Sequence, residues 1–425
     1  MEHRTGDRDL VAATHVCRYW RSTLTSSPSL WTCFRFRPSH DINIDRVLAY
    51  LERSKSVPID IEMDIDSPRG LEVFEHLAPH IAKTSSFIVG GGLVHATSLL
   101  FCSPAPSLKH LEMDSHERYV RLSDNFLGQH APLLRRIRLR NIHLAFESTF
   151  PLPDLTEFNL HLRENAAPFC MSALFRFLSN SPRLKKICIE APGEMLQDAS
   201  LDQVISLESL VELQYTCDAA GSILPRLRLP RLEQLSVSSS FGLGQARKLV
   251  NILPRDSHLL REGATKMEYH AYSNRETLEF TGKGVGVTLS VPLVWASPTP
   301  VDWFSDTKYI PFGQIQELTV GYSPNNTDFP VAAFENLEIL RIIPWEVPFT
   351  EGLFRSLYPG TEVPCRSLRA IEYLRLESLG PLISLVKARL QVGHRLKLVW
   401  LAVLPESERS AVAELRELVG EVLIK

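Results

Sequence analysis

A short apolar pattern returns nine times along this 425-residue chain. Each copy has an apolar residue, two mostly polar residues, a second apolar residue, one spacer and a third apolar residue. The copies are Leu108-Leu111-Met113, Leu134-Ile137-Leu139, Leu155-Phe158-Leu160, Leu184-Ile187-Ile189, Leu210-Leu213-Tyr215, Leu232-Leu235-Val237, Ile315-Leu318-Val320, Leu337-Leu340-Ile342 and Leu368-Ile371-Tyr373. A unit of this length cannot bury its own apolar face, so neighbouring units must stack and share a core.

The spacing of the copies is at or slightly beyond the period of leucine-rich repeats, roughly 20–29 residues, except across one long gap between Leu232 and Ile315. Strand-like segments alternate with helical connectors, such as residues 171–178 and 245–253. This order predicts a parallel sheet with helices on its outer side. We therefore expect an α/β fold, specifically a leucine-rich-repeat-like solenoid with parallel strands on its concave face. A curved solenoid of this kind typically provides a binding surface.

The expected solenoid covers residues 45–425. Helical spacing over 45–53 and strict alternation over 57–65 predict its first helix and strand. The long gap has no clean copy of the pattern, so we expect a degenerate or inserted segment at about 254–312, with a hairpin-like insertion. An amphipathic pattern over 407–419 predicts a C-terminal helical cap at about 404–425.

Residues 10–31 form the second informative stretch. Apolar positions recur at helical spacing from Val11 to Leu24, which predicts one short amphipathic helix. Asp9 is a suitable N-cap, and Pro28 lies where the helix must end. Trp31 then follows as an aromatic anchor. A helix this short needs a partner for its apolar face.

Two runs in this stretch, residues 16–20 (Val-Cys-Arg-Tyr-Trp) and 28–31 (Pro-Ser-Leu-Trp), resemble the second half of an F-box. That motif reads V-C-[KR]-x-W, a short spacer, then P-x-L-W. An F-box followed by irregular repeats is similar to F-box proteins of mushroom-forming fungi. The resemblance implies a partial F-box over residues 1–38 that docks on a Skp-family adaptor of a cullin–RING ubiquitin ligase, while the repeats hold a protein substrate. The residues implied in adaptor binding or packing are Leu10, Val16, Cys17, Tyr19, Trp20, Pro28, Leu30 and Trp31.

The sequence departs from a complete F-box at its start. A complete motif opens with a Leu-Pro and an apolar helix, whereas only a short polar stretch, from Met1 to Asp9, precedes Leu10. Either the protein begins upstream of Met1 or the adaptor contact has been lost. A different interpretation is that Tyr19, Trp20 and Trp31 cap the exposed end of the solenoid. The chain would then be an adaptor-independent leucine-rich-repeat scaffold.

The concave face would be formed by strand residues that alternate with the apolar positions. Solenoid specificity depends on such surface side chains, which follow no motif. The candidates for contact with an unknown protein partner are His110, Arg138, Arg140, Asn159, His161, Gln214 and Arg341.

The sequence favours binding over catalysis. It contains no H-E-x-x-H or G-x-S-x-G motif, and the glycines at 282, 284 and 286 precede a β-branched strand rather than a phosphate-binding helix. His76 and His80 have helical spacing but no third metal ligand beside them. We expect no enzymatic activity and no catalytic, cofactor-binding or metal-binding residues.

Charge and cysteine content limit the partners and the compartment. The formal net charge of −3 gives no case for nucleic acid or an anionic membrane. The sequence has neither an apolar run long enough to cross a bilayer nor a secretory segment, so we expect a cytoplasmic or nuclear protein. The seven cysteines include no C-x-x-C pair and predict reduced thiols. Cys188 and Cys217 lie in strand segments, and we expect them in the core.

Overall fold

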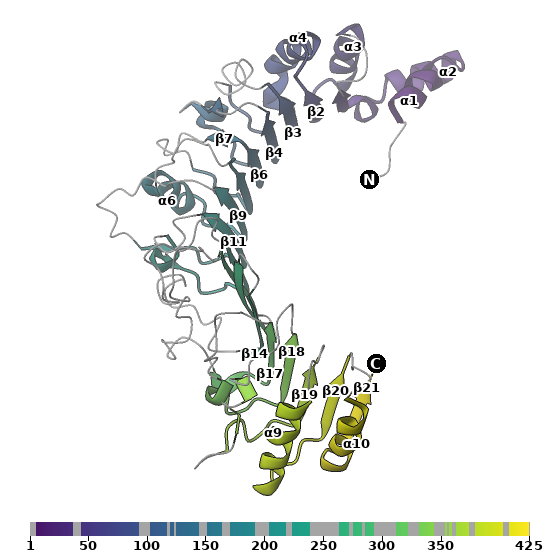
Figure 1. The fold of residues 1–425 in the computed structure, drawn as a ribbon. Coiled ribbons are helices and arrows are strands. Elements are labelled where there is room, and N and C mark those ends of the chain that lie inside the picture. Colours follow the sequence, from purple (N-terminus) through teal and green to yellow (C-terminus); the bar gives the residue numbers. More distant parts are fainter. Residues whose placement is uncertain are drawn as a thin grey trace. The chain divides into compact units, whose positions relative to one another are not determined.

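The computed structural model describes residues 6–36, 44–92, 103–116, 120–122, 125–143, 151–163, 171–191, 204–217, 223–238, 263–271, 275–282, 285–292, 312–321, 331–343, 353–354, 357–358, 363–373, 379–402 and 408–424. The chain divides into two compact units, Met1–Leu201 and Asp202–Lys425, called unit 1 and unit 2 here. Both combine helices with mostly parallel strands, which confirms the α/β class (Figure 1). The helix predicted over 245–253 lies outside the described residues.

Unit 1 contains a sheet of parallel strands. In spatial order the strands are β1 (Cys33–Phe36), β2 (Ile59–Asp64), β3 (Thr84–Gly91), β4 (His110–Ser115), β6 (Arg136–Arg140), β8 (Glu157–His161) and β9 (Lys186–Ala191). Spatial order follows chain order, so each stretch of chain adds its strand beside the preceding one. The sheet starts at β1, earlier than the predicted start near residue 45. A short parallel pair, β5 (Val120–Arg121) with β7 (Ile142–His143), lies apart from this sheet.

Unit 2 continues the parallel pattern around an antiparallel insertion. Its strands in spatial order are β11 (Glu212–Cys217), β13 (Gln234–Ser238), β16 (Val285–Pro292), β15 (Arg275–Gly282), β14 (Ala264–Ala271), β17 (Glu317–Gly321), β18 (Ile339–Ile343), β19 (Ala370–Tyr373), β20 (Leu398–Leu401) and β21 (Glu421–Ile424). Among these strands only β15 runs against its neighbours. The segment expected to hold a hairpin-like insertion therefore contains a three-stranded meander, β14–β16. A separate pair, β10 (Ile205–Ser206) with β12 (Leu227–Arg228), is parallel.

Helices occupy some of the connections between strands. The described α-helices are α1 (Gly6–Thr14), α2 (Arg18–Thr25), α3 (Ile44–Ser54), α4 (Pro68–Leu77), α6 (Met171–Ser179), α9 (Gly380–Gln391) and α10 (Arg409–Leu418). The 3-10 turns are η1 (Pro28–Trp31), η2 (Ala78–Lys83), η3 (Phe126–Gln129), η4 (Leu224–Arg226), η6 (Phe312–Gln314) and η7 (Val331–Ala333). In unit 1, α3, α4 and α6 lie on one side of the sheet (Figure 1). The other face of that sheet is formed by strand side chains alone in the described part of the unit.

The nine repeated apolar triads form the core of the two sheets. Every one of their side chains whose burial is described is at most 7% exposed. Neighbouring triads are in register, so that Leu111 pairs with Ile137, and Leu340 with Ile371. Successive side chains of a strand point to opposite faces, so burying the second and third residue of each triad turns the intervening residue outward.

A tight turn, which the apolar pattern did not predict, precedes every triad. The N–H of the first apolar residue donates to the carbonyl three residues earlier in all nine copies, as in Leu155 to Leu152 (3.1 Å) and Leu337 to Phe334 (3.2 Å). The accepting residues are all buried: Ala105, Ala131, Leu152, Ser181, Leu207, Leu229, Phe312, Phe334 and Cys365. Five of the nine turns have proline at their second position, where its fixed φ suits a β-turn.

Side chains at these turns stack between consecutive copies. The rings of Phe312 and Phe334 are 4.8 Å apart between centroids and nearly perpendicular. Phe334 is fully buried. Each copy therefore buries a fourth residue, three positions before the triad.

The expectation of a single N-terminal helix is wrong. The chain forms two helices, α1 and α2, which separate at Cys17, where the backbone is extended (φ −157°, ψ 170°). The Cys17 Sγ accepts a hydrogen bond from the Trp20 N–H at 3.4 Å and so caps α2. Asp9 lies inside α1 rather than at its N-cap. A side-chain acceptor in extended backbone is what allows a second helix to begin there.

The C-terminal cap is helical only in part. Helix α10 ends at Leu418, and the chain then forms β21, which pairs in parallel with β20. Gly420 lies at this transition, where an added Cβ would be 2.7 Å from the Lys397 carbonyl oxygen. Only glycine permits such a close backbone approach. The described chain therefore ends on an edge strand.

The expectation that Cys188 lies in the core is also wrong. Its neighbours Ile187 and Ile189 are buried, and strand alternation turns Cys188 to the opposite face, where it is half-buried. Among the described cysteines, Cys17, Cys33, Cys188 and Cys365 are in no disulfide bond. Burial raises the pKa of Cys365 to about 12, so this thiol stays protonated. The burial of Cys217 lies outside the described side chains.

The turn residue Phe334 offers a test of this core. We expect Phe334→Ala to lower the free energy of unfolding by about 3–5 kcal/mol, because it removes a fully buried ring and leaves a cavity beside Phe312. The matched control is Glu335→Ala at the next, exposed position, which we expect to change stability by less than about 0.5 kcal/mol. Urea denaturation measures both, and equal midpoints for the two variants would contradict this role for the turn.

Candidate functional site

The N-terminal helices are attached to the unit 1 sheet through Trp31. Its indole is fully buried, and its Nε1–H donates to the Leu24 carbonyl at 2.8 Å. The Tyr50 ring meets it edge-on at 4.9 Å, and the Arg53 guanidinium lies 4.4 Å from its centroid. Both of these residues belong to α3. Trp31 therefore joins α2 to the first helix that covers the sheet.

Contacts within the N-terminal segment fix α2 against α1. The Arg21 Nε–H donates to the carbonyl of Thr14, the last residue of α1, at 2.9 Å. The Thr14 hydroxyl in turn donates to the Val11 carbonyl at 2.6 Å. Among the residues that the F-box resemblance implies, Leu10 and Pro28 are half-buried, and the exposed Cys17 serves as the cap of α2. Cys17 and Trp31 therefore have structural roles in this segment.

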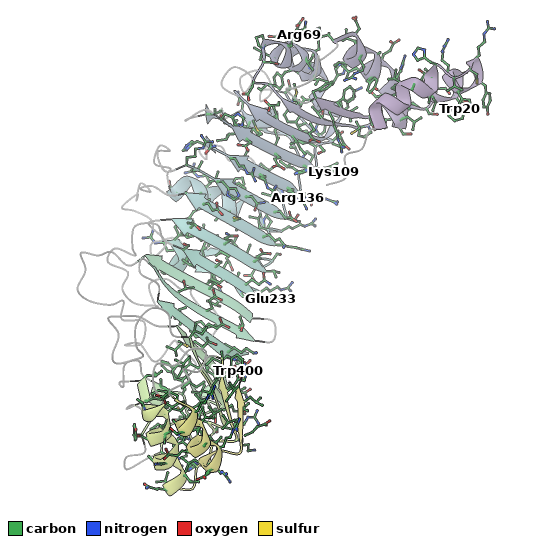
Figure 2. All side chains as sticks on the ribbon, turned by 45° about the vertical axis from the view of Figure 1, so that its right-hand side comes forward. Trp20, Arg69, Lys109, Arg136, Glu233 and Trp400 are labelled. Carbon is green, nitrogen blue, oxygen red and sulfur yellow. The ribbon has the colours of Figure 1, made fainter. Side chains whose placement is uncertain are left out.

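The other four implied residues are exposed. Val16 (68% exposed), Tyr19 (76%), Trp20 (50%) and Leu30 (44%) are among the most exposed large apolar side chains that the structure describes. We call them the N-terminal apolar set. Figure 2 shows Trp20 on the N-terminal helices of unit 1, clear of the strands. Exposed apolar side chains gathered in one segment are typical of an interaction site.

The candidate partner-binding residues all lie on the outward face of their strands. His110, Arg138, Asn159, His161, Gln214 and Arg341 are half-buried, and Arg140 is exposed. In unit 1 their register places Glu112 beside Arg138, and Asp114 beside Arg140. Arg138 contacts Glu112 at 3.4 Å and Arg140 contacts Asp114 at 3.3 Å. The arginines were predicted from the sequence as partner-binding residues, whereas the acids that neutralise them were not.

His110 lies in the same charged row. Burial and the neighbouring Arg136 guanidinium lower its pKa below the ordinary 6.5, with Glu112 acting in the opposite direction. Arg136 itself contacts Glu157 at 2.6 Å on the next strand (Figure 2 labels Arg136). His110 therefore favours the neutral imidazole, which can both donate and accept a hydrogen bond.

Arg341, a candidate residue of unit 2, makes two ion pairs on the outward face. Its Nη1 contacts Glu317 at 2.8 Å, and its Nε contacts Glu372 at 2.7 Å. Lys266 also contacts Glu317 at 2.8 Å, so one row of charges crosses β14, β17, β18 and β19. Burial works against ionisation of Glu317, but hydrogen bonds from Lys266 and Arg341 lower its pKa below the ordinary 4.5. These opposite charges hold one another in place.

Gln214 borders a hollow on the outward face of unit 2. The hollow has a volume of about 400 Å³ and lies over β11, β13 and β16. Its lining is mostly polar and includes two carboxylates: Glu212, Gln214, Glu233, Gln234, Ser236 and Thr288. Such a lining suits a polar or basic side chain of a partner.

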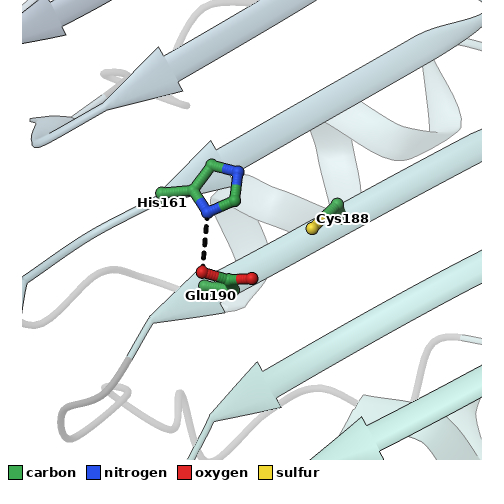
Figure 3. Close-up of side chains that lie close together, drawn as sticks. All are labelled: His161, Cys188 and Glu190. Atoms are coloured by element: carbon green, nitrogen blue, oxygen red, sulfur yellow. Dashed lines mark hydrogen bonds and ion pairs between the residues drawn. The ribbon is translucent and has the colours of Figure 1, made fainter.

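His161 is brought close to two residues that were not selected from the sequence. Its Nδ1 lies 2.7 Å from the Glu190 Oε2, and the thiol of Cys188 is nearby (Figure 3). Asn159 lies beside Cys188 in the strand register. The sequence did contain a signal for this cluster. Cys188 and Glu190 occupy alternate positions of one strand, and aligning the triads places them opposite Asn159 and His161 of the preceding strand.

Comparison with known proteins leaves the family open. No protein-family model matches the chain, and no curated protein matches it. Within the described part of the chain, none of the helices has the length and apolar character needed to cross a bilayer.

Glu317 gives the site a predictable pH dependence. Its pKa is lower in the folded protein than in the unfolded chain, so its ionised form contributes stability above pH 4.5 that is lost as the pH falls through the folded pKa. We expect Glu317→Gln to lose less stability than the wild type between neutral pH and a pH well below 4.5. Denaturant unfolding at both pH values measures this, with Glu335→Gln as the exposed control. If Glu317→Gln lost as much stability in acid as the wild type does, this prediction would be contradicted.

Proposed function

We propose that the chain is the substrate-recognition subunit of an SCF-type cullin–RING ubiquitin ligase. The N-terminal segment contacts a Skp-family adaptor, and a leucine-rich-repeat-like solenoid binds a protein target. The observation that carries the proposal is the N-terminal apolar set, which coincides with F-box-like residues. Its aromatic members, Tyr19 and Trp20, lie on α2, which the buried Trp31 joins to α3. A rigid support for exposed aromatic side chains lowers the entropy cost of binding.

The repeated geometry supports the solenoid part of the proposal. Nine copies share the same turn, and their strands pair in parallel on either side of the meander. The residue after the first apolar position also donates to a carbonyl of the preceding copy, as in Arg135 to Lys109 (2.9 Å) and Glu338 to Gln316 (2.8 Å). Units that bond only to their neighbours in one register are typical of solenoids.

The outward strand face supports target binding at the repeats. It is formed by polar residues held in fixed positions by cross-strand pairs, such as Arg138 with Glu112 and Arg341 with Glu317 and Glu372. Because these arginines are already neutralised, recognition would rely on the pattern of hydrogen-bonding groups and on the hollow beside Gln214. We propose a protein target, no enzymatic activity, no nucleic-acid or membrane partner, and a cytoplasmic or nuclear location.

A second function is an adaptor-independent repeat scaffold. Its support is the position of Trp31, which is buried against α3 and directly precedes the first strand, β1. In this alternative the N-terminal helices serve as a terminal cap. Tyr19 and Trp20 contribute little to such a cap because both are largely exposed.

Co-purification of the full chain with a Skp-family adaptor tests the first function. We expect a stable complex, and we expect Trp20→Ala to weaken it by tenfold or more, as truncation of an aromatic anchor typically costs about 2 kcal/mol or more. Leu133→Ala is the control, since Leu133 is an exposed apolar residue of unit 1 that lies between strands. Titration calorimetry or biolayer interferometry gives the affinities.

Two outcomes would argue against the adaptor role. Absence of a complex with correctly folded wild-type chain would favour the repeat scaffold. Equal affinities for the wild type, Trp20→Ala and Leu133→Ala would mean that any adaptor contact lies outside the N-terminal apolar set.

A further inference from the structure

Three side chains of different chemistry converge on the outward face of β8 and β9. They are His161 at the end of β8, and Cys188 and Glu190 on β9. One nitrogen, sulfur or oxygen atom from each lies within 4.8 Å of the corresponding atoms of the other two (Figure 3). We infer that His161, Cys188 and Glu190 form a binding site for one Zn²⁺ ion.

The backbone presents the three residues on a rigid support. Cys188 and Glu190 are two residues apart on one strand, so their side chains leave the same face. His161 is in register with Glu190 on the neighbouring strand. The Leu162 N–H donates to the Glu190 carbonyl at 2.6 Å, which continues the pairing beyond the end of β8. Sites built on paired strands hold their ligands more closely than sites on loops.

The donor set favours zinc over other common cations. A thiolate, an imidazole and a carboxylate are all ligands that Zn²⁺ accepts, whereas Mg²⁺ and Ca²⁺ select oxygen donors. Ligand atoms on a tetrahedral zinc ion lie roughly 3.4–3.6 Å apart, given bond lengths of about 2.0–2.3 Å. The three atoms lie within 4.8 Å of one another, and the His161 Nδ1 and Glu190 Oε2 lie 2.7 Å apart, so side-chain rotations that draw in the thiol and separate this pair would bring them to zinc spacing. Binding releases the thiol proton to solvent, and the neutral imidazole keeps its one proton on the nitrogen that does not bind the metal.

Burial and charge around the three residues are compatible with an ion. All three side chains are half-buried, which leaves room for water as a fourth ligand. The hydrogen bond of 2.7 Å between the His161 Nδ1 and the Glu190 Oε2 already holds two of the ligands together. The neighbouring cation in register is Arg140, and its Nη1 is directed to Asp114 at 3.3 Å. This pairing reduces the repulsion that Arg140 would exert on a zinc ion.

Zinc titration of the chelator-treated full chain tests the inference. With a chromophoric zinc chelator as competitor, we expect uptake of one Zn²⁺ per chain, and an affinity at least about tenfold lower in Cys188→Ser and in His161→Gln. Co²⁺ should give a thiolate charge-transfer band with the wild type that Cys188→Ser lacks. Cys17→Ser is the matched control, because it removes an exposed thiol elsewhere in unit 1 while keeping a side-chain cap.

The result is interpretable even if a variant is unstable. Circular dichroism and urea unfolding without metal establish whether each variant is folded, and the cobalt spectrum of the wild type stands without any variant. No stoichiometric zinc uptake by the wild type would overturn the inference. The inference would also be overturned if Cys188→Ser and His161→Gln were folded and still bound zinc with the affinity of the wild type.

Discussion

The turn before each apolar triad is the constraint on which the rest of the fold depends. Its single hydrogen bond, such as Leu155 N–H to the Leu152 carbonyl, fixes the residue at which the chain enters the strand. A shift of one residue would exchange the buried and outward faces of that strand. The turn thus decides that Phe158 and Leu160 are buried and that Asn159 points outward. It places the outward residues of the nine triad strands, including His161 and Arg138.

A fixed entry point also explains how the connectors can vary in length. A helix such as α6 or a short turn serves equally, as long as the next turn delivers its strand in register. The meander β14–β16 is the longest such variation, because it inserts three strands between the triad strands β13 and β17. An inserted group with an odd number of antiparallel strands keeps its two outer strands parallel to each other. For that reason β16 can pair in parallel with β13, and β14 with β17.

Much of the sheet could be predicted from the sequence, because the triads alone identify the strand centres. Aligning the triads also predicts the ion pair between Glu112 and Arg138. These two residues occupy the same position in two successive copies and therefore lie opposite each other in the sheet. The contact of Arg341 with Glu317 was beyond such reasoning, because it runs diagonally across the register rather than along it. Strands β1 and β21 were missed for a related reason. Each is short and lies at an end of its sheet, where pairing with a neighbour outweighs a weak local pattern.

The N-terminal segment contains two tryptophans whose environments differ, although local sequence treats them alike. Trp31 is buried because Tyr50 and Arg53 of α3 enclose it, and α3 lies well beyond Trp31 along the chain. Trp20 has no such cover, and half of its surface is exposed. A cap would bury both rings against the sheet, since exposed aromatic area costs free energy in water. The contrast gives Trp31 a structural role and leaves Trp20 and the neighbouring Tyr19 as exposed aromatic side chains that the fold itself does not cover.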